Sequence, residues 1–254
     1  MLISKTFVIV LLFATVLIFS TTSAQSFGFG CLGFVGGYGG YSYQKYNPQG
    51  LNDYITVFNA DNNDSSLIPM GKFGVARGYR VGLNFFRANI KGFILTTKGF
   101  YQTLSEKKQA YVSAAGGSTV IYDLEMKNWG VGIVLGTALT GALSWKVVDA
   151  AVLFNTATFT NTMNSPGPTT SILKYNSDKT YIGYSVGTGF ILAIIDNYIS
   201  IEGMAGYTAL TINKMQLGDG TLLKVDENSS SPMKNFISAG GFNAVVQLNI
   251  GFPL

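Results

Sequence analysis

The feature that most constrains this chain is an alternation of period two that runs almost to its carboxyl end. Along 236–252, every second residue is apolar or small, whereas the intervening positions turn to amides and glycine in the second half. Successive side chains of a strand point to opposite sides of a sheet, so the pattern predicts a strand with a different solvent on each face. One face carries Phe242, Val246, Leu248 and Ile250, and the other carries Asn243, Gln247 and Asn249.

Residues 1–24 have the layout of a secretory signal peptide. Lys5 precedes an apolar run over 6–20, and Thr22-Ser23-Ala24 supplies the small residues that precede a cleavage site. The run is shorter than the ~20 apolar residues of a spanning helix. We therefore expect cleavage after Ala24 and a single mature domain over 25–254, with an uncleaved anchor helix as the alternative.

The composition favours a membrane protein without transmembrane helices. Charged residues make up 12% of the chain, against about 25% in average proteins. The most apolar stretch of the expected mature chain, 128–145, is interrupted by four glycines, and each costs a helix about 1 kcal/mol relative to alanine. In hydrocarbon, only helices and closed sheets pair every backbone amide, so we expect a closed barrel.

The connections between alternating segments have two lengths. Short ones near 89–91, 138–141 and 196–197 alternate with long polar ones. Alternate connections of an up-and-down barrel emerge on opposite rims, so every long loop lies on one rim, as in transmembrane barrels. The sequence thus predicts an all-β, antiparallel, up-and-down transmembrane β-barrel of eight strands, or ten if 105–118 adds a hairpin arm. The expected strands are 27–46, 72–88, 91–104, 119–137, 143–157, 179–193, 198–213 and 235–252, and the long loops are 47–71, 105–118, 158–178 and 214–234.

These features together resemble the small outer-membrane β-barrels of bacteria, of the OmpA/OmpX type and the porin-family type of Bacteroidota. The resemblance rests on the signal ending in Ala-Gln, the strand count, the loop asymmetry and the aromatic final strand. It implies a place in the outer membrane of a Gram-negative bacterium, with outer-membrane lipid and the barrel-insertion machinery as partners. It also implies that Phe252 is the C-terminal insertion signal, although Pro253-Leu254 departs from the family pattern.

The same alternation assigns a set of polar side chains to the barrel interior: Arg80, Lys98, Asp149, Glu202 and Asn243. An eight-stranded barrel has little room beyond its own side chains. We interpret the charged members as a buried ion-pair network that fills and locks the lumen. The alternative is a selectivity lining of a pore, or a catalytic group.

Two positions break the alternation. Arg77 falls on the lipid-facing side of 72–88, and a charge at the bilayer midplane costs about 2–4 kcal/mol. We therefore expect Arg77 near the outer rim or at a bulge. In 119–137 the apolar residues change sides, which predicts a β-bulge near Lys127-Asn128. Aromatic residues that fit interfacial girdles are Trp129, Trp145, Tyr198 and Phe252.

The chain contains no histidine and one cysteine. Ser–His and Asp–His catalysis is therefore excluded, and so are the usual His/Cys zinc sites and an internal disulfide. We expect a non-enzymatic protein with no cofactor or metal and, since no Lys/Arg run is present, no nucleic-acid partner. Its expected role is surface interaction through the loops at 47–71, 158–178 and 214–234, or envelope structure. The alternatives are a narrow pore for small solutes and a secreted, lipocalin-like binding barrel.

Overall fold

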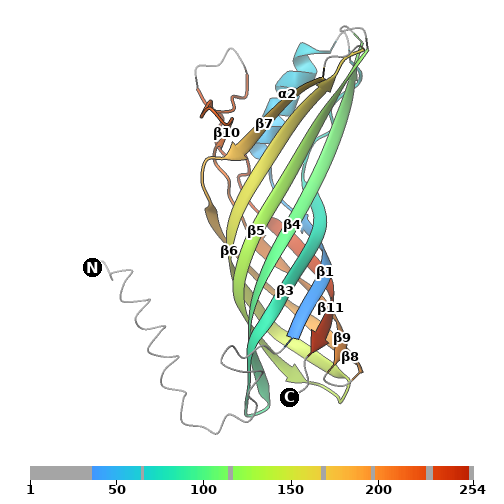
Figure 1. The fold of residues 1–254 in the computed structure, drawn as a ribbon, viewed down its shortest axis with the longest axis vertical. Coiled ribbons are helices and arrows are strands. Elements are labelled where there is room, and N and C mark those ends of the chain that lie inside the picture. Colours follow the sequence, from blue (N-terminus) through green and yellow to red (C-terminus); the bar gives the residue numbers. More distant parts are fainter. Residues whose placement is uncertain are drawn as a thin grey trace, which may run out of the picture.

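The protein is described from a computed structural model, which covers residues 36–63, 66–113, 117–166, 170–195, 198–226 and 231–251. The expected signal peptide and Phe252 lie outside these described residues. Within them the chain forms one helix and eleven strands (Figure 1). These elements are β1 Gly36–Lys45, α2 Gln49–Asp61, β2 Ser66–Ile68, β3 Val75–Ile90, β4 Phe93–Val112, β5 Ser118–Ala138, β6 Leu143–Asn164, β7 Thr170–Ser177, β8 Tyr181–Ile195, β9 Ile199–Ala209, β10 Met215–Gln216 and β11 Gly241–Gly251.

Eight of the strands form a closed antiparallel barrel. Their order around it is β1-β3-β4-β5-β6-β8-β9-β11, and β11 pairs again with β1. The predicted eight-stranded, up-and-down barrel is therefore confirmed. The ten-strand alternative is not observed, because most of 105–118 extends β4 and β5 instead of forming a separate hairpin.

The connections have the predicted asymmetry, with two corrections. At one end, Lys91-Gly92 joins β3 to β4 with positive φ at both residues, as a two-residue hairpin requires, and 139–142 joins β5 to β6. At the other end, long excursions carry α2 with β2 and then β10. The loops expected at 105–118 and 158–178 are instead largely strand, because β4, β5 and β6 continue beyond the end of β1 (Figure 1).

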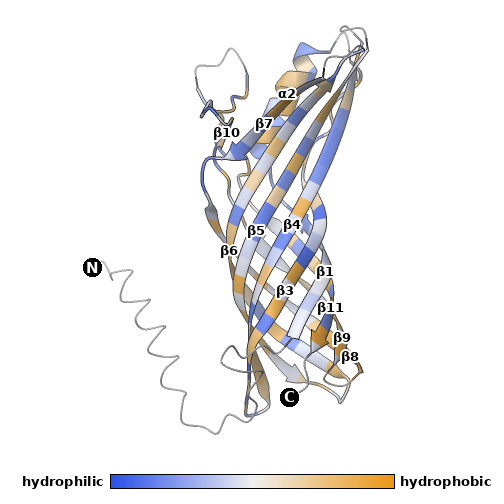
Figure 2. Cartoon of the chain, in the orientation of Figure 1, coloured by the Kyte–Doolittle hydropathy of each residue, from blue (hydrophilic) through white to orange (hydrophobic). Residues whose placement is uncertain are grey.

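The outer surface of the barrel is an apolar belt. Outward side chains such as Val131 and Ile133 of β5, and Val186 of β8, are exposed. Hydrophobic colour gathers on the lower part of β3 and around β8 and β9 (Figure 2). A closed barrel with an outward apolar band is the structure that strands adopt in a lipid bilayer. The protein is therefore a transmembrane barrel of the outer-membrane type, and the alternative of a water-soluble binding barrel is wrong. β11 has the predicted parity, with Val246 outward and Asn243 buried, but it begins at Gly241, and Phe236 is buried elsewhere.

Aromatic side chains encircle the barrel at the upper edge of this belt. Tyr101 contacts Trp129 with ring centroids 4.9 Å apart, and Tyr43 contacts Phe242 at 6.4 Å. Trp145 and Tyr198 are exposed at the opposite edge, so both interfaces carry the aromatic residues typical of membrane barrels. The upper ring comprises Tyr41, Tyr43, Tyr79, Tyr101, Trp129, Phe154, Tyr184, Tyr207 and Phe242.

Above this ring the two faces of the sheet exchange character without a change of register. In β5, even-numbered residues stay buried from Ser118 to Val134, and the pairing with β4 is unbroken across Lys127 and Asn128. The β-bulge expected there is therefore wrong. Outward positions turn polar because the strand leaves lipid for water, and inward positions turn apolar because other parts of the chain cover them.

The cover is a cap formed by α2 and the segments 66–74, 210–226 and 231–240, which fills the upper end of the barrel. Leu51 and Ile55 of α2 are completely buried, and burial of such a side chain contributes about 1.5–3 kcal/mol. The ring of Phe159 from β6 contacts Tyr122 of β5 and Phe236 of the cap, with centroids 5.3 and 5.8 Å apart. The sequence predicted a polar loop here, and this apolar core at the upper end of the barrel was not expected.

Two asparagines of α2 hold the helix to the chain that follows it. Asn52 donates to the carbonyl of Phe73 at 3.1 Å and accepts from its N–H at 2.9 Å. Asn59 makes the same pair of bonds with Met70, at 2.9 and 2.8 Å. Each amide thus satisfies both backbone groups of one residue, so the return segment needs no strand partner.

Among the described residues, no helix has the length and hydropathy to cross a bilayer.

The exchange of faces predicts opposite outcomes for one substitution at two outward positions of β5. Ile133→Lys places a charge in the apolar belt and should lower the free energy of unfolding by about 2–4 kcal/mol. Thr119→Lys, on the same face above the belt, should change it by less than about 0.5 kcal/mol. Urea titration of the protein refolded in phospholipid vesicles measures both. Equal costs would contradict the placement of the membrane.

Candidate functional site in the barrel interior

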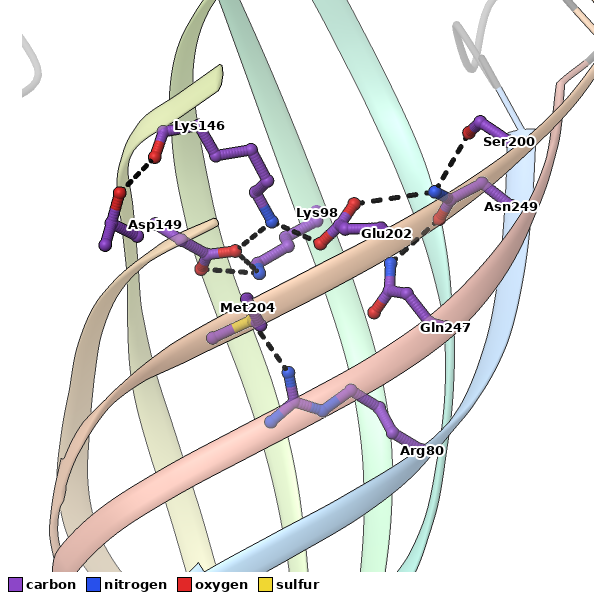
Figure 3. Close-up of polar contacts among 10 residues, drawn as sticks. Arg80, Lys98, Lys146, Asp149, Ser200, Glu202, Met204, Gln247 and Asn249 are labelled. Carbon is purple, nitrogen blue, oxygen red and sulfur yellow. Dashed lines mark hydrogen bonds and ion pairs between the residues drawn. The ribbon is translucent and has the colours of Figure 1, made fainter. Parts of the chain in front are cut away.

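The structure places all five sequence-predicted site residues inside the barrel. Arg80 of β3, Lys98 of β4, Asp149 of β6, Glu202 of β9 and Asn243 of β11 are each at most 5% exposed. They reach the interior because the alternation of each strand, set by its lipid-facing residues, leaves the opposite positions inward. Lys98, Asp149 and Glu202 meet in one network. Arg80, which Figure 3 also shows, and Asn243 lie apart from it.

The network is a chain of alternating charges across the lumen (Figure 3). Lys98 Nζ donates to both carboxylate oxygens of Asp149 at 2.6 Å. Lys146 Nζ lies 2.5 Å from Asp149 Oδ2 and also donates to Glu202 Oε1. Two ammonium groups thus neutralise two carboxylates. Replacing such a network by apolar side chains is often neutral in energy, whereas removing one member costs about 3–5 kcal/mol.

Lys146 is the member that sequence reasoning missed, and a bulge explains why. Residues 146 and 149 of a regular strand point to opposite faces, so the alternation that places Asp149 inside places Lys146 outside. Here Lys146 opposes Gly189 and Asp149 opposes Gly187, so β6 holds one more residue than β8 in this interval. Both side chains therefore point inward. The one sequence signal was the pair of opposite charges three residues apart.

Thr188 of β8 satisfies backbone and side-chain groups beside the bulge. Its Oγ1 donates to the carbonyl of Lys146 at 2.7 Å and accepts from Trp145 Nε1 at 3.0 Å. Trp145 is one of the lower interfacial aromatics, so the bulge is tied both to the lipid-facing surface and to the buried network.

The interior also contains Arg80, a cation that forms no ion pair with any described carboxylate. Arg80 Nε donates to Gln102 Oε1 at 2.8 Å, and the guanidinium carbon lies 4.2 Å from the ring centroid of Phe100. Its other contact is Met204 Sδ at 3.9 Å. The network itself is neutral, with Lys98 and Lys146 against Asp149 and Glu202. Arg80, which lies outside it, therefore adds one positive charge to the interior.

Amide side chains separate the network from the cap. Asn128 and Asn243 are buried in the lumen, and the Oδ1 atom of each has no hydrogen-bond partner among the described residues. Asn155 Nδ2 donates to the carbonyl of Tyr181 at 3.1 Å. Asn243, which the sequence assigned to the polar network, therefore belongs to this amide layer and does not touch the ion pairs.

Beneath the network, a polar cavity of about 430 Å³ opens at the end with the short connections. Its inner end is formed by Tyr38, Lys98, Lys146 and Glu202, and its outer end reaches the turn at 139–142. Asn249 Nδ2, on its wall, lies 3.5 Å from Glu202 Oε2 and donates to Ser200 Oγ at 3.1 Å. The lumen is thus open on this side as far as the ion pairs and occupied by side chains beyond them.

At the opposite end, Glu106 ties the cap to the barrel. Its Oε2 accepts from Tyr46 Oη at 2.7 Å and from the N–H groups of Gly74 and Val75 at 2.9 and 2.7 Å. Lys108 Nζ lies 3.0 Å from Oε1. Burial, and next the charge of Glu106, raise the pKa of Tyr46, so the phenol remains a donor at physiological pH.

The interior offers little reactive chemistry. The described residues contain no group of three or more His, Cys, Asp or Glu side chains that could hold a metal ion. Among the described residues, the inward carboxylates Glu106, Asp149 and Glu202 are all paired with lysines, and the sequence has no histidine to serve as a base. The ion pairs link side chains of β4, β6 and β9 across the interior.

Known proteins resemble the chain only weakly. No protein-family model and no curated protein sequence matches the chain. Solved structures that resemble it include Neisserial surface protein A (14% identity, TM-score 0.41, covering 86% of this chain and 97% of that one). Others are Ail of Yersinia pestis in complex with the heparin analogue sucrose octasulfate (8%, 0.38, 86% and 98%) and the outer membrane protease OmpT of Escherichia coli (10%, 0.39, 86% and 94%). The assignment of the fold rests on strand pairing and the apolar belt, not on these similarities.

The ion-pair network predicts a specific asymmetry between single and paired substitutions. Asp149→Ala leaves Lys98 buried without a carboxylate and should lower the free energy of unfolding by about 3–5 kcal/mol. The double variant Lys98→Met/Asp149→Leu removes both charges and should recover most of that loss, while Lys146 stays paired with Glu202. Urea titration in vesicles measures both variants. A double variant as unstable as the single one would contradict the network.

Proposed function

We propose that the protein is a closed, non-enzymatic outer-membrane barrel that holds a rigid folded cap above the membrane for contact with molecules or surfaces outside the cell. The observation that carries the proposal is the apolar core beneath α2, where Leu51, Ile55 and Phe236 are fully buried inside the upper end of the barrel. An apolar core of this density blocks ions and leaves the outer surface of the cap as the accessible part.

Two further observations support a closed lumen. The ion pairs of Lys98, Lys146, Asp149 and Glu202 cross the channel below the cap, and an eight-stranded barrel has room for little more than its side chains. A solute would have to displace first the ionic contacts and then the apolar core.

The second candidate function, a narrow conduit, is favoured by the cavity that reaches the ion pairs from the other end.

The segment around β10 is an exposed part of the cap that a partner could contact. Leu223 N–H donates to the carbonyl of Met215 at 2.8 Å, so 214–224 forms a small hairpin that projects from the cap (Figure 1). Its base is buried through Met215 and Leu223, whereas Asp219 and Lys224 are exposed. Together with 47–71 and the largely extended segment 158–178, this hairpin makes up the surface that we propose contacts a protein or surface ligand. Insertion through Phe252 stays a prediction.

Electrical recording tests the closed lumen. The full-length protein, refolded and shown to migrate as a heat-modifiable folded band, should give no steady ion-dependent openings in a planar bilayer. The variant Lys98→Ala/Asp149→Ala should also be silent, because the apolar core remains. Steady current through the unaltered protein would overturn this proposal in favour of the conduit. Current only in the variant would show that the ion pairs, not the cap, close the lumen.

Protease access tests the orientation of the cap. Trypsin added to intact cells should cleave at Lys214 or Lys224, which are exposed in the hairpin around β10. The matched control is Lys91, which is equally a surface lysine but lies in the turn at the opposite rim. It should be cut only after the membrane is opened. Cleavage at Lys91 in intact cells, with the hairpin protected, would show that the barrel has the opposite orientation and that the cap faces the inside of the cell envelope.

A further inference from the structure

Arg77 is the cation on the lipid-facing side of β3 that the sequence analysis expected near the rim, and the structure places it there. It lies on the outward face two residues above Tyr79, opposite Tyr43 of β1 and Ser105 of β4. No bulge is involved, because the register shift of β3 lies lower, between Asn84 and Phe86. Arg77 therefore sits at the upper edge of the aromatic ring, at the level where lipid head groups meet a membrane protein.

Within the part of the chain that the structure describes, Arg77 makes no ion pair and no side-chain hydrogen bond. Glu125, the carboxylate on the next strand beyond Ser105, is already engaged, because its Oε2 lies 3.1 Å from Lys127 Nζ. Lys45 is exposed on the adjacent β1, diagonally across from Arg77. This stretch of the rim therefore presents two outward cations and no free carboxylate beside them.

Arg77 also lines a shallow groove of about 310 Å³ on the outer surface. The rings of Tyr41 and Tyr79 form one wall, edge to face with centroids 5.8 Å apart. The other wall carries the hydroxyl-bearing side chains of Thr103 and Ser105. The groove thus combines a forked guanidinium, the Ser105 hydroxyl as a further hydrogen-bond donor, and two aromatic faces. Thr103 Oγ1 already donates to Glu125 Oε1 at 3.4 Å.

We propose that this groove binds the phosphorylated head group of a lipid in the surrounding outer leaflet. A guanidinium offers a phosphate two parallel hydrogen bonds, which a lysine ammonium does not, and the Ser105 hydroxyl adds a third donor. The groove faces the membrane at head-group height rather than open water. The occupant is therefore a lipid, whose acyl chains extend down the apolar belt below Tyr79, and not a soluble phosphate.

The test measures binding of dioctanoyl phosphatidic acid to the full-length protein in neutral detergent by native mass spectrometry. Arg77→Gln should weaken binding about fivefold, the effect of one basic side chain near a membrane surface. Arg77→Lys should lose less, because it keeps the charge but not the fork. The matched control is Arg87→Gln, an exposed arginine near the other end of the same strand, which should bind like the unaltered protein.

Three results would overturn the proposal. They are equal binding by Arg77→Gln and the unaltered protein, an equal loss in Arg87→Gln, and binding of inorganic phosphate as tight as that of phosphatidic acid. Dioctanoylglycerol, which lacks the phosphate, should bind weakly and independently of residue 77. A heat-modifiable folded band for each variant separates a loss of binding from a loss of folding.

Discussion

The rest of the structure depends on the need to pair every backbone amide that lies in hydrocarbon. An unpaired group there costs several kcal/mol, so a strand can cross lipid only as part of a sheet that closes on itself. The ring from β1 through β11 and back to β1 meets this need. Once the ring is closed, each strand has one face toward lipid and one toward a narrow interior, and the composition of both faces follows.

That constraint ends where the strands leave the membrane, and above that level the strands carry their apolar side chains on the inner face. β4, β5 and β6 keep their register above the aromatic ring while their apolar side turns from outward to inward. The interior therefore has two regions with different energetics. The apolar core beneath α2 contributes stability through burial, whereas buried ion pairs such as those around Asp149 often add little net stability relative to apolar side chains.

Two irregular positions bring charged side chains to places where the regular alternation would not put them. The bulge in β6 brings Lys146 to the same face as Asp149 and so completes the ion pairs that cross the lumen. Arg77 departs from the lipid-facing pattern at the height where hydrocarbon gives way to head groups, so a charge that would be costly deeper in the membrane becomes a binding group. Both departures sit at a boundary between two solvents, where the local rule changes.

The sequence by itself determined the barrel, its eight strands, the rim that carries the long connections, and the inward positions of Arg80, Lys98, Asp149, Glu202 and Asn243. These follow from a period of two, which survives any tertiary context because it is a property of a single strand. Only the tertiary structure decided that Lys146 points inward, since a bulge is a mismatch between two strands. It also decided that the apolar face of 119–127 meets α2, because alternation separates two faces without saying which solvent or neighbour each will contact.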